Sequence, residues 1–385
     1  MLSMRHISER RKLFTLTAIV LGALGFLIIC SCALLSALGS SEGPLMGLIL
    51  SAAAVLISLT LALLLLLLYN RLDPYEKEPL GLVLSAVAWG AAVATMFSCG
   101  ISSVAEGVLR ALLGEGVARG MSAALIAPVV EELFKALGVL GIFLIARHEV
   151  NSILDGFLYG AMVGLGFTTV ENISYILTQG VLPAGTIGFI TMLFMRWLAT
   201  PLLHQLTTAY FGISLAWGKL SGKWYHYLGG AIGGYAIALL IHLLWNSSLV
   251  LVELLKEPII SLAALILVPT FIYTSFGLPL GIILWNSIKR ERELIDSELR
   301  ALSWLPEHLR RAVTDLALRR SLKETLGSEL GRRLDSLLNG LAFWALLRRE
   351  GKEGRVLSDL IQDNEELLRA LGVKWEGDTY ERGTD

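Results

Sequence analysis

Charged residues are scarce in the first three quarters of this 385-residue chain. Of its 65 Asp, Glu, Lys and Arg residues, only 28 fall in positions 1–288, whereas 37 fall in the last 97 positions. Hydrophobic residues make up 55% of the chain and the mean hydropathy is +0.66, which excludes an ordinary soluble domain. The change in charge density near Lys289 therefore predicts a membrane domain followed by a soluble tail.

Other scarce features exclude further classes of protein. The three cysteines, Cys30, Cys32 and Cys99, lie in apolar runs at spacings that match no metal site, so we expect them to pack as small hydrophobic residues. A net charge of −1 gives no reason to expect a nucleic-acid partner. The first apolar run is too long for a cleaved signal peptide, and no small-residue cleavage site follows Leu38.

Apolar runs long enough to cross a bilayer dominate the first 288 residues. They lie at about 14–38, 45–69, 80–108, 122–146, 153–179, 186–217, 229–254 and 259–287. Lys and Arg cluster on alternate flanks of these runs, which orients a membrane protein with the basic flanks inside. We therefore predict an all-α polytopic bundle of about eight transmembrane helices in the cell membrane, with both termini cytoplasmic.

The predicted organisation has three parts. Residues 1–13 form a cytoplasmic N-terminus, residues 14–288 the membrane domain and residues 289–385 a soluble helical cytoplasmic tail. In the tail, Leu and Ala recur at three- and four-residue spacing, which is typical of amphipathic helices. Arginine pairs such as Arg310-Arg311 recur along it. We interpret them as solvated helix faces, and contact with anionic lipid headgroups is the alternative.

Ionisable residues inside the apolar runs are the strongest indication of function. Each costs roughly 2.5–3.5 kcal/mol to insert into a bilayer, so such residues usually mark a functional site. Four consecutive runs carry glutamates and histidines, the residue types of a hydrolase. These residues are Glu131, Glu132, Glu171, His204 and His242.

The first pair of glutamates is followed by a lysine on the same helical face. Glu132 and Lys135 are three residues apart, and Glu131 and Lys135 are four apart. Lys135 can therefore neutralise one carboxylate and leave the other free to act as a base. The alternative is an intrahelical ion pair that only eases insertion.

The next run carries a stripe of small residues that ends in a carboxylate. Gly156, Gly160 and Gly164 recur every four residues, and Phe167 and Glu171 continue the stripe. Small residues let a neighbouring helix backbone approach closely, so Glu171 should lie in a helix–helix contact. The adjacent Asn172 is expected to cap the helix or to form a hydrogen bond across the bundle.

Polar residues also align on the sixth and seventh runs. Arg196, Thr200, His204 and Thr208 are four residues apart, which predicts one polar stripe on a helix over 186–217. His242 and Asn246 are also four apart. Asn246 is expected to donate a hydrogen bond to a developing oxyanion or to hold the imidazole tautomer.

Taken in order, these motifs resemble the PrsW family of intramembrane proteases. The motifs are Glu131-Glu132-x-x-Lys135, Phe167-x-x-x-Glu171-Asn172, His204, and His242-x-x-x-Asn246. The resemblance covers about residues 60–255, the predicted catalytic core. It implies kinship with the CAAX prenyl endopeptidases and bacteriocin-processing proteins, and a regulatory role such as release of a membrane-bound anti-sigma factor.

The predicted activity is hydrolysis of peptide bonds in membrane-protein or peptide substrates. Glu131 is expected to activate water, since a carboxylate in an apolar pocket becomes a competent base near neutral pH. Two routes stay open. In one, Glu171, His204 and His242 hold Zn²⁺. In the other, no metal is used, Glu131 and Glu171 transfer the protons, and His204, His242 and Asn246 stabilise the oxyanion.

Two other classes of function remain as alternatives. Glutamate and histidine chains also relay protons in transporters, although this chain has no internal repeat of the kind that transporters carry. A catalytically inactive membrane scaffold is the other. In each case the lipid bilayer is the surrounding partner, and the sequence does not indicate an oligomeric state.

Overall fold

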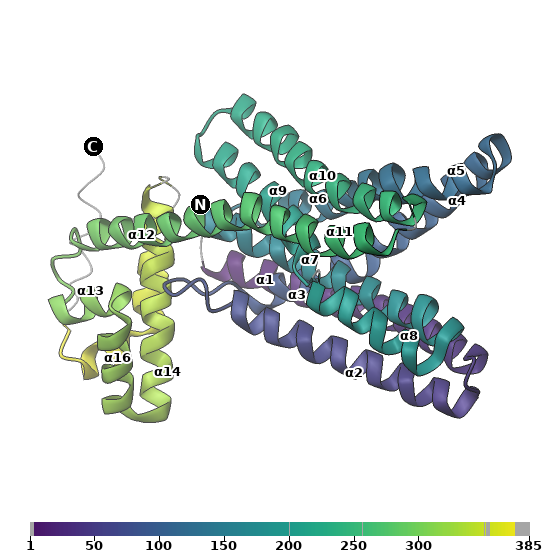
Figure 1. Cartoon of the computed structure of the whole chain (residues 1–385). Helices are drawn as coiled ribbons and strands as arrows, with labels where there is room; N and C mark the ends of the chain where they lie inside the picture. The colour runs from purple at the N-terminus through teal and green to yellow at the C-terminus, as the bar shows by residue number, and fades with distance from the viewer. Residues whose placement is uncertain (1–3, 200, 256, 350, 352–354, 374–385) are drawn as a thin grey trace. The chain divides into compact units, whose positions relative to one another are not determined.

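The computed structural model of the chain describes residues 4–199, 201–255, 257–349, 351 and 355–373. Throughout this part of the chain the regular elements are helices (Figure 1). They fall into two compact units, a larger one of residues 11–71 and 78–285 and a smaller one of residues 1–10, 72–77 and 286–385. The three-part domain organisation expected from the sequence stays a prediction.

In the larger unit, π-helical turns (η) interrupt or extend several α-helices. The elements in chain order are α1 (Met4–Gly39), α2 (Pro44–Tyr69), α3 (Leu80–Ala88), η1 (Trp89–Ala94), α4 (Thr95–Leu113), α5 (Glu115–Met121), η2 (Ser122–Ile126), α6 (Ala127–Ile145), α7 (Ile153–Tyr175), η3 (Ile176–Val181), α8 (Leu182–Phe194), η4 (Met195–Ala199), α9 (Leu203–Leu220), α10 (Trp224–Leu255), α11 (Pro258–Ile272) and η5 (Tyr273–Gly277). Helix α12 (Leu278–Leu299) runs from residues of the larger unit into residues of the smaller one.

Six helical stretches of the described chain are long and apolar enough to cross a membrane. They are Lys12–Gly39, Pro44–Tyr69, Leu80–Leu113, Ile153–Trp197, Trp224–Leu255 and Pro258–Leu299. The prediction of an all-helical membrane protein is therefore confirmed. Helices α6 and α9 are outside this set, α6 because it carries Glu131, Glu132 and Lys135 within 19 residues.

The prediction of one helix over 186–217 is wrong, because a turn at Gly185 precedes this segment and a break at Leu202 divides it. Gly185 has a positive φ of 54°, a conformation that glycine adopts without strain, and it breaks the helical run that begins at Ile153. On either side of this turn, the backbones of Gly180 and Gly188 pack together. A second break follows at Leu202, where φ is −119° and ψ is 9°, next to Pro201, which has no N–H to continue a helix.

This second break also removes the predicted stripe on one helix face. Arg196 lies in η4 and His204 in α9, on either side of the non-helical Leu202. Thr200, the intermediate member of the stripe, lies outside the described residues. Four-residue spacing was therefore misleading here, because it assumes an unbroken helix.

Helix α7 is the central helix of the larger unit and is buried on nearly every face. A capping box starts it, in which the Ser152 hydroxyl accepts the Asp155 N–H and the Asp155 carboxylate accepts the Ser152 N–H. The predicted close approach at its glycine stripe is confirmed. A Cβ added at Gly156, Gly160 or Gly164 would collide with backbone carbonyl groups of α9.

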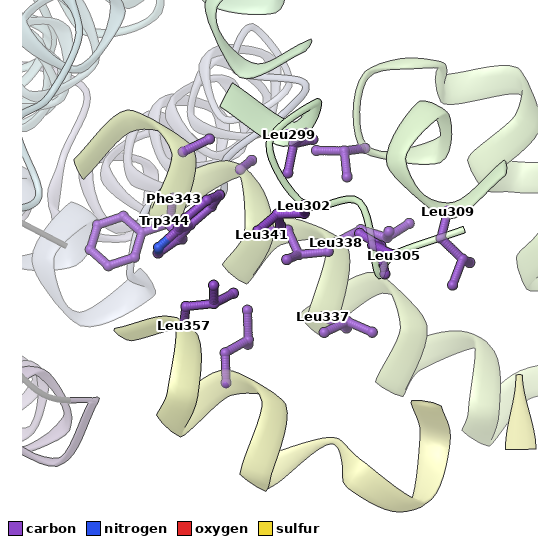
Figure 2. Close-up of a cluster of buried hydrophobic side chains, with 14 of the residues drawn as sticks. Leu299, Leu302, Leu305, Leu309, Leu337, Leu338, Leu341, Phe343, Trp344 and Leu357 are labelled. Atoms are coloured by element: carbon purple, nitrogen blue, oxygen red, sulfur yellow. The ribbon is translucent and has the colours of Figure 1, made fainter. Parts of the chain in front are cut away.

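The smaller unit has its own hydrophobic core. Its helices are α13 (Glu307–Thr314), α14 (Leu316–Arg349), α15 (Val356–Asp363) and α16 (Glu365–Ala370), and α14 bends at Gly327, where φ is 78°. Figure 2 shows the interior, in which leucines that follow α12 and precede α13 meet leucines of α14. Trp344 is fully buried in this core. The tail is thus a folded helical body.

Candidate functional site

Lys135 of α6 is fully buried and lies between Glu132 and His204. The Lys135 side chain is 0% exposed, and its Nζ lies 2.6 Å from Glu132 Oε1 and 3.1 Å from His204 Nδ1. It also lies over the ring of Phe167, 4.7 Å from the centroid. The prediction that Lys135 pairs with one glutamate of its own helix is confirmed, and Glu132 is that partner.

His242 of α10 lies between the two glutamates of α6. Its Nδ1 is 2.7 Å from Glu132 Oε1, and its Nε2 is 3.7 Å from Glu131 Oε2. Because a carboxylate accepts, the Nδ1–H of His242 donates to Glu132, and Nε2 faces Glu131. A carboxylate behind a histidine in this way fixes the tautomer and makes the other nitrogen a better ligand.

His204 of α9 has different partners. With the Lys135 ammonium donating to its Nδ1, the ring proton is on Nε2, which lies 2.8 Å from Glu171 Oε2. Glu171 also forms an ion pair with Arg196. The Arg196 Nε–H donates to Asn172 Oδ1 over 2.7 Å, and Asn172 Nδ2 donates back to the Arg196 carbonyl. Arg196 therefore supports Glu171 from η4, although no shared helix places it there.

These contacts bring the expected residues into one buried cluster. The rings of His204 and His242 are 5.0 Å apart, and that of Phe167 is 5.0 Å from His204. Glu131, His204 and His242 each offer a ligand atom, and these atoms lie within 4.8 Å of one another. The Oε2 atom of Glu131 is buried and has no hydrogen-bond partner among the described residues.

The Asn246 side chain forms a hydrogen bond with a backbone group of η2. Its side-chain nitrogen donates to the Ala123 carbonyl of η2 over 2.9 Å. The tautomer of His242, one of the two tasks expected of Asn246, is fixed by Glu132 instead. A role for Asn246 as an oxyanion donor stays a prediction.

Two contacts of the cluster were not anticipated. The Thr207 hydroxyl lies 3.1 Å from Glu132 Oε1, and the Arg196 guanidinium lies 4.5 Å from the centre of the Tyr175 ring. Thr207 follows His204 by three residues and so shares its helix face, a spacing that could have identified it. Tyr175 carries no such signal, because the turn at Gly185 brings Arg196 to it.

The fold and cluster define a polytopic helical membrane protein with a buried glutamate–histidine site. The family model described as "PrsW family intramembrane metalloprotease" matches residues 78–274, and the chain belongs to this family. It is also similar to a curated protein named Protease PrsW from Geobacillus kaustophilus (strain HTA426), with 37% identity over 111 residues. That match covers 28% of this chain and 45% of the relative, and no solved structure matches.

Proposed function

We propose that this chain is an intramembrane endopeptidase that hydrolyses peptide bonds of membrane-associated substrates at the cluster of Glu131, Glu171, His204 and His242. The observation that carries the proposal is the buried Oε2 atom of Glu131, which has no hydrogen-bond partner among the described residues. A buried carboxylate oxygen without a donor is costly, so it indicates a water, ion or substrate that binds there during function.

Hydrogen bonds and ion pairs fix the positions of the side chains around the Glu131 carboxylate. Oε1 of Glu132 accepts hydrogen bonds from Lys135, Thr207 and His242, whereas Oε2 of Glu131 faces the His242 Nε2. Arg196 and Asn172 hold Glu171 against His204. This fixed geometry suits a reaction in which protons move between carboxylates and imidazoles.

The donor set fits a catalytic metal ion. Two imidazoles and a carboxylate with ligand atoms within 4.8 Å match in number the three protein ligands of catalytic zinc sites, and His204 would release either Lys135 or Glu171 to bind the ion. When bound, zinc would polarise the substrate carbonyl and lower the pKa of a water molecule. We favour Glu131 as the carboxylate ligand over Glu171, the ligand expected from the sequence, because Glu171 already accepts from Arg196 and His204.

In this assignment Glu171 is the carboxylate left to transfer protons. Its side chain is 15% exposed, and it already accepts a hydrogen bond from His204. Metal content separates the two assignments. Purified Glu131→Gln should lose bound zinc and Glu171→Gln should keep it, whereas the reverse result would restore Glu131 as the base.

Proteolysis itself is tested with purified protein in liposomes and a set of single-span membrane peptides, with the products identified by mass. The native protein should cleave, and Glu131→Gln should not. Glu106→Gln, which removes a partly exposed carboxylate paired with Arg110 on α4, is the matched control and should cleave normally. Absence of cleavage by the native protein loaded with zinc would favour a transporter or a scaffold.

Several finer features belong to the same proposal. Eight spans follow if α6 and α9 also cross the membrane with the six apolar stretches. Excess Lys and Arg on alternate flanks supports cytoplasmic termini. A boundary near residue 288 between membrane domain and tail follows from the change in charge density. An anti-sigma factor as substrate rests on the family resemblance alone.

A further inference from the structure

The smaller unit contains a cavity of about 380 Å³ that lies apart in sequence from every residue of the proposed active site. It is formed by the end of α12 and the following Arg300, by α13, and by Asp315, which precedes α14. Pockets of about 300–1,000 Å³ are the size that holds small-molecule ligands. Four of the side chains that line it are arginines, namely Arg292, Arg300, Arg310 and Arg311.

Hydrogen bonds and buried side chains hold the wall of the cavity together. The Thr314 hydroxyl donates to Asp296 Oδ1 over 2.5 Å, which ties the end of α13 to α12. Arg310 donates to the Arg300 carbonyl over 3.4 Å. Thr314 is buried, and Leu299 belongs to the hydrophobic core. Most side chains around the cavity are therefore presented by packed helices.

Of the four lining arginines, only Arg292 lies within ion-pair distance of an acidic residue of the lining. Asp296 is bound to Thr314, and its other oxygen is 4.0 Å from Arg292 Nε. Asp315 Oδ1 accepts the backbone N–H groups of Ala317 and Leu318 at the start of α14. Within the described chain, Arg300, Arg310 and Arg311 form no ion pair with a carboxylate.

We propose that this cavity binds a small molecule that carries a phosphate group. Guanidinium groups bind phosphate with paired hydrogen bonds, and several arginines converging on one cavity repel one another until an anion is bound. Glu307, the remaining acid of the lining, can accept a hydrogen bond from a hydroxyl or amino group of the same ligand. Free nucleotides and glycerophosphate headgroups of lipids share this chemistry.

The test uses the full-length protein in phosphatidylcholine nanodiscs, with AMP and glycerol 3-phosphate as probes in calorimetric titrations. Saturable binding is expected. Arg300→Gln and Arg311→Gln should each weaken it about tenfold, since each removes a charge-assisted contact. Arg320→Gln is the matched control, because it removes an exposed charge of α14 outside the cavity lining. Both cavity arginines are exposed, so these variants should keep the native melting temperature.

Nanodiscs that also contain phosphatidylglycerol distinguish the two sources of phosphate. Probe affinity that falls there for the native protein identifies a lipid headgroup in the cavity, and unchanged affinity identifies a free phosphate compound. Failure of both probes to bind in phosphatidylcholine discs would overturn the proposal. So would equal weakening by Arg320→Gln, because the binding would then reflect general charge attraction.

Discussion

Removal of the buried ammonium group of Lys135 should destabilise the larger unit by about 3–5 kcal/mol, the usual cost of leaving a buried charge without its partner. Lys135→Met keeps much of the side-chain length and volume but deletes the contacts to Glu132, at 2.6 Å, and to His204, at 3.1 Å. Because both partners of the ion pair are almost fully buried, water cannot easily replace the lost donor.

The matched variant Glu132→Gln isolates the charge contribution. A glutamine at position 132 can still accept from His242 and Thr207, so the double variant should be more stable than Lys135→Met alone. Reversible unfolding of all four proteins in detergent micelles gives the coupling free energy. Strictly additive losses, or a Lys135→Met protein as stable as the native one, would refute the buried pair.

Three further predictions follow from particular contacts. Asn246→Ala should keep measurable protease activity, with a loss of at most about 10²–10³-fold in rate, which product formation over time would measure. Gly164→Ala should lower thermal stability by about 1–3 kcal/mol because its Cβ meets the backbone of α9, whereas Gly141→Ala, with open space around it, should not. A normal Gly164→Ala protein would contradict the packing of α7 on α9. Burial raises the pKa of Asp335, whereas the hydrogen bond and the positive charge of Arg319 lower it. The lowering effects outweigh burial, so the net shift of the pKa is downward. The stabilisation is therefore present above the ordinary pKa of about 3.9 and lost as pH falls through the folded-state value. Asp335→Asn should remove this acid dependence from the unfolding of the tail, followed by tryptophan fluorescence.

Spacing along an unbroken helix predicted several contacts correctly. Lys135 and Glu132 are one turn apart on α6, so their pairing needs no knowledge of the rest of the fold. The glycines of α7 likewise indicated a close helix neighbour. Both predictions depend only on local geometry.

Contacts that depend on breaks in the helices were not predictable in this way. The turn at Gly185 is stabilised by Glu42, whose carboxylate accepts from the Thr186 N–H and hydroxyl across 144 residues of sequence. Nothing in the local pattern indicates that partner, and the turn determines where Arg196 lies. The contact of Glu132 with His242 joins two helices across 110 residues, so no local spacing indicates it.

The central claim is that Glu131, His204 and His242 form one metal-dependent proteolytic site. Its most direct test measures bound zinc and peptide cleavage together in the native protein, in His242→Ala and in the control His226→Ala, which alters a histidine beside Trp217 and Tyr225. We expect the native and control proteins to hold zinc and to cleave, and His242→Ala to lose both. A His242→Ala protein that keeps zinc and full activity would contradict the site.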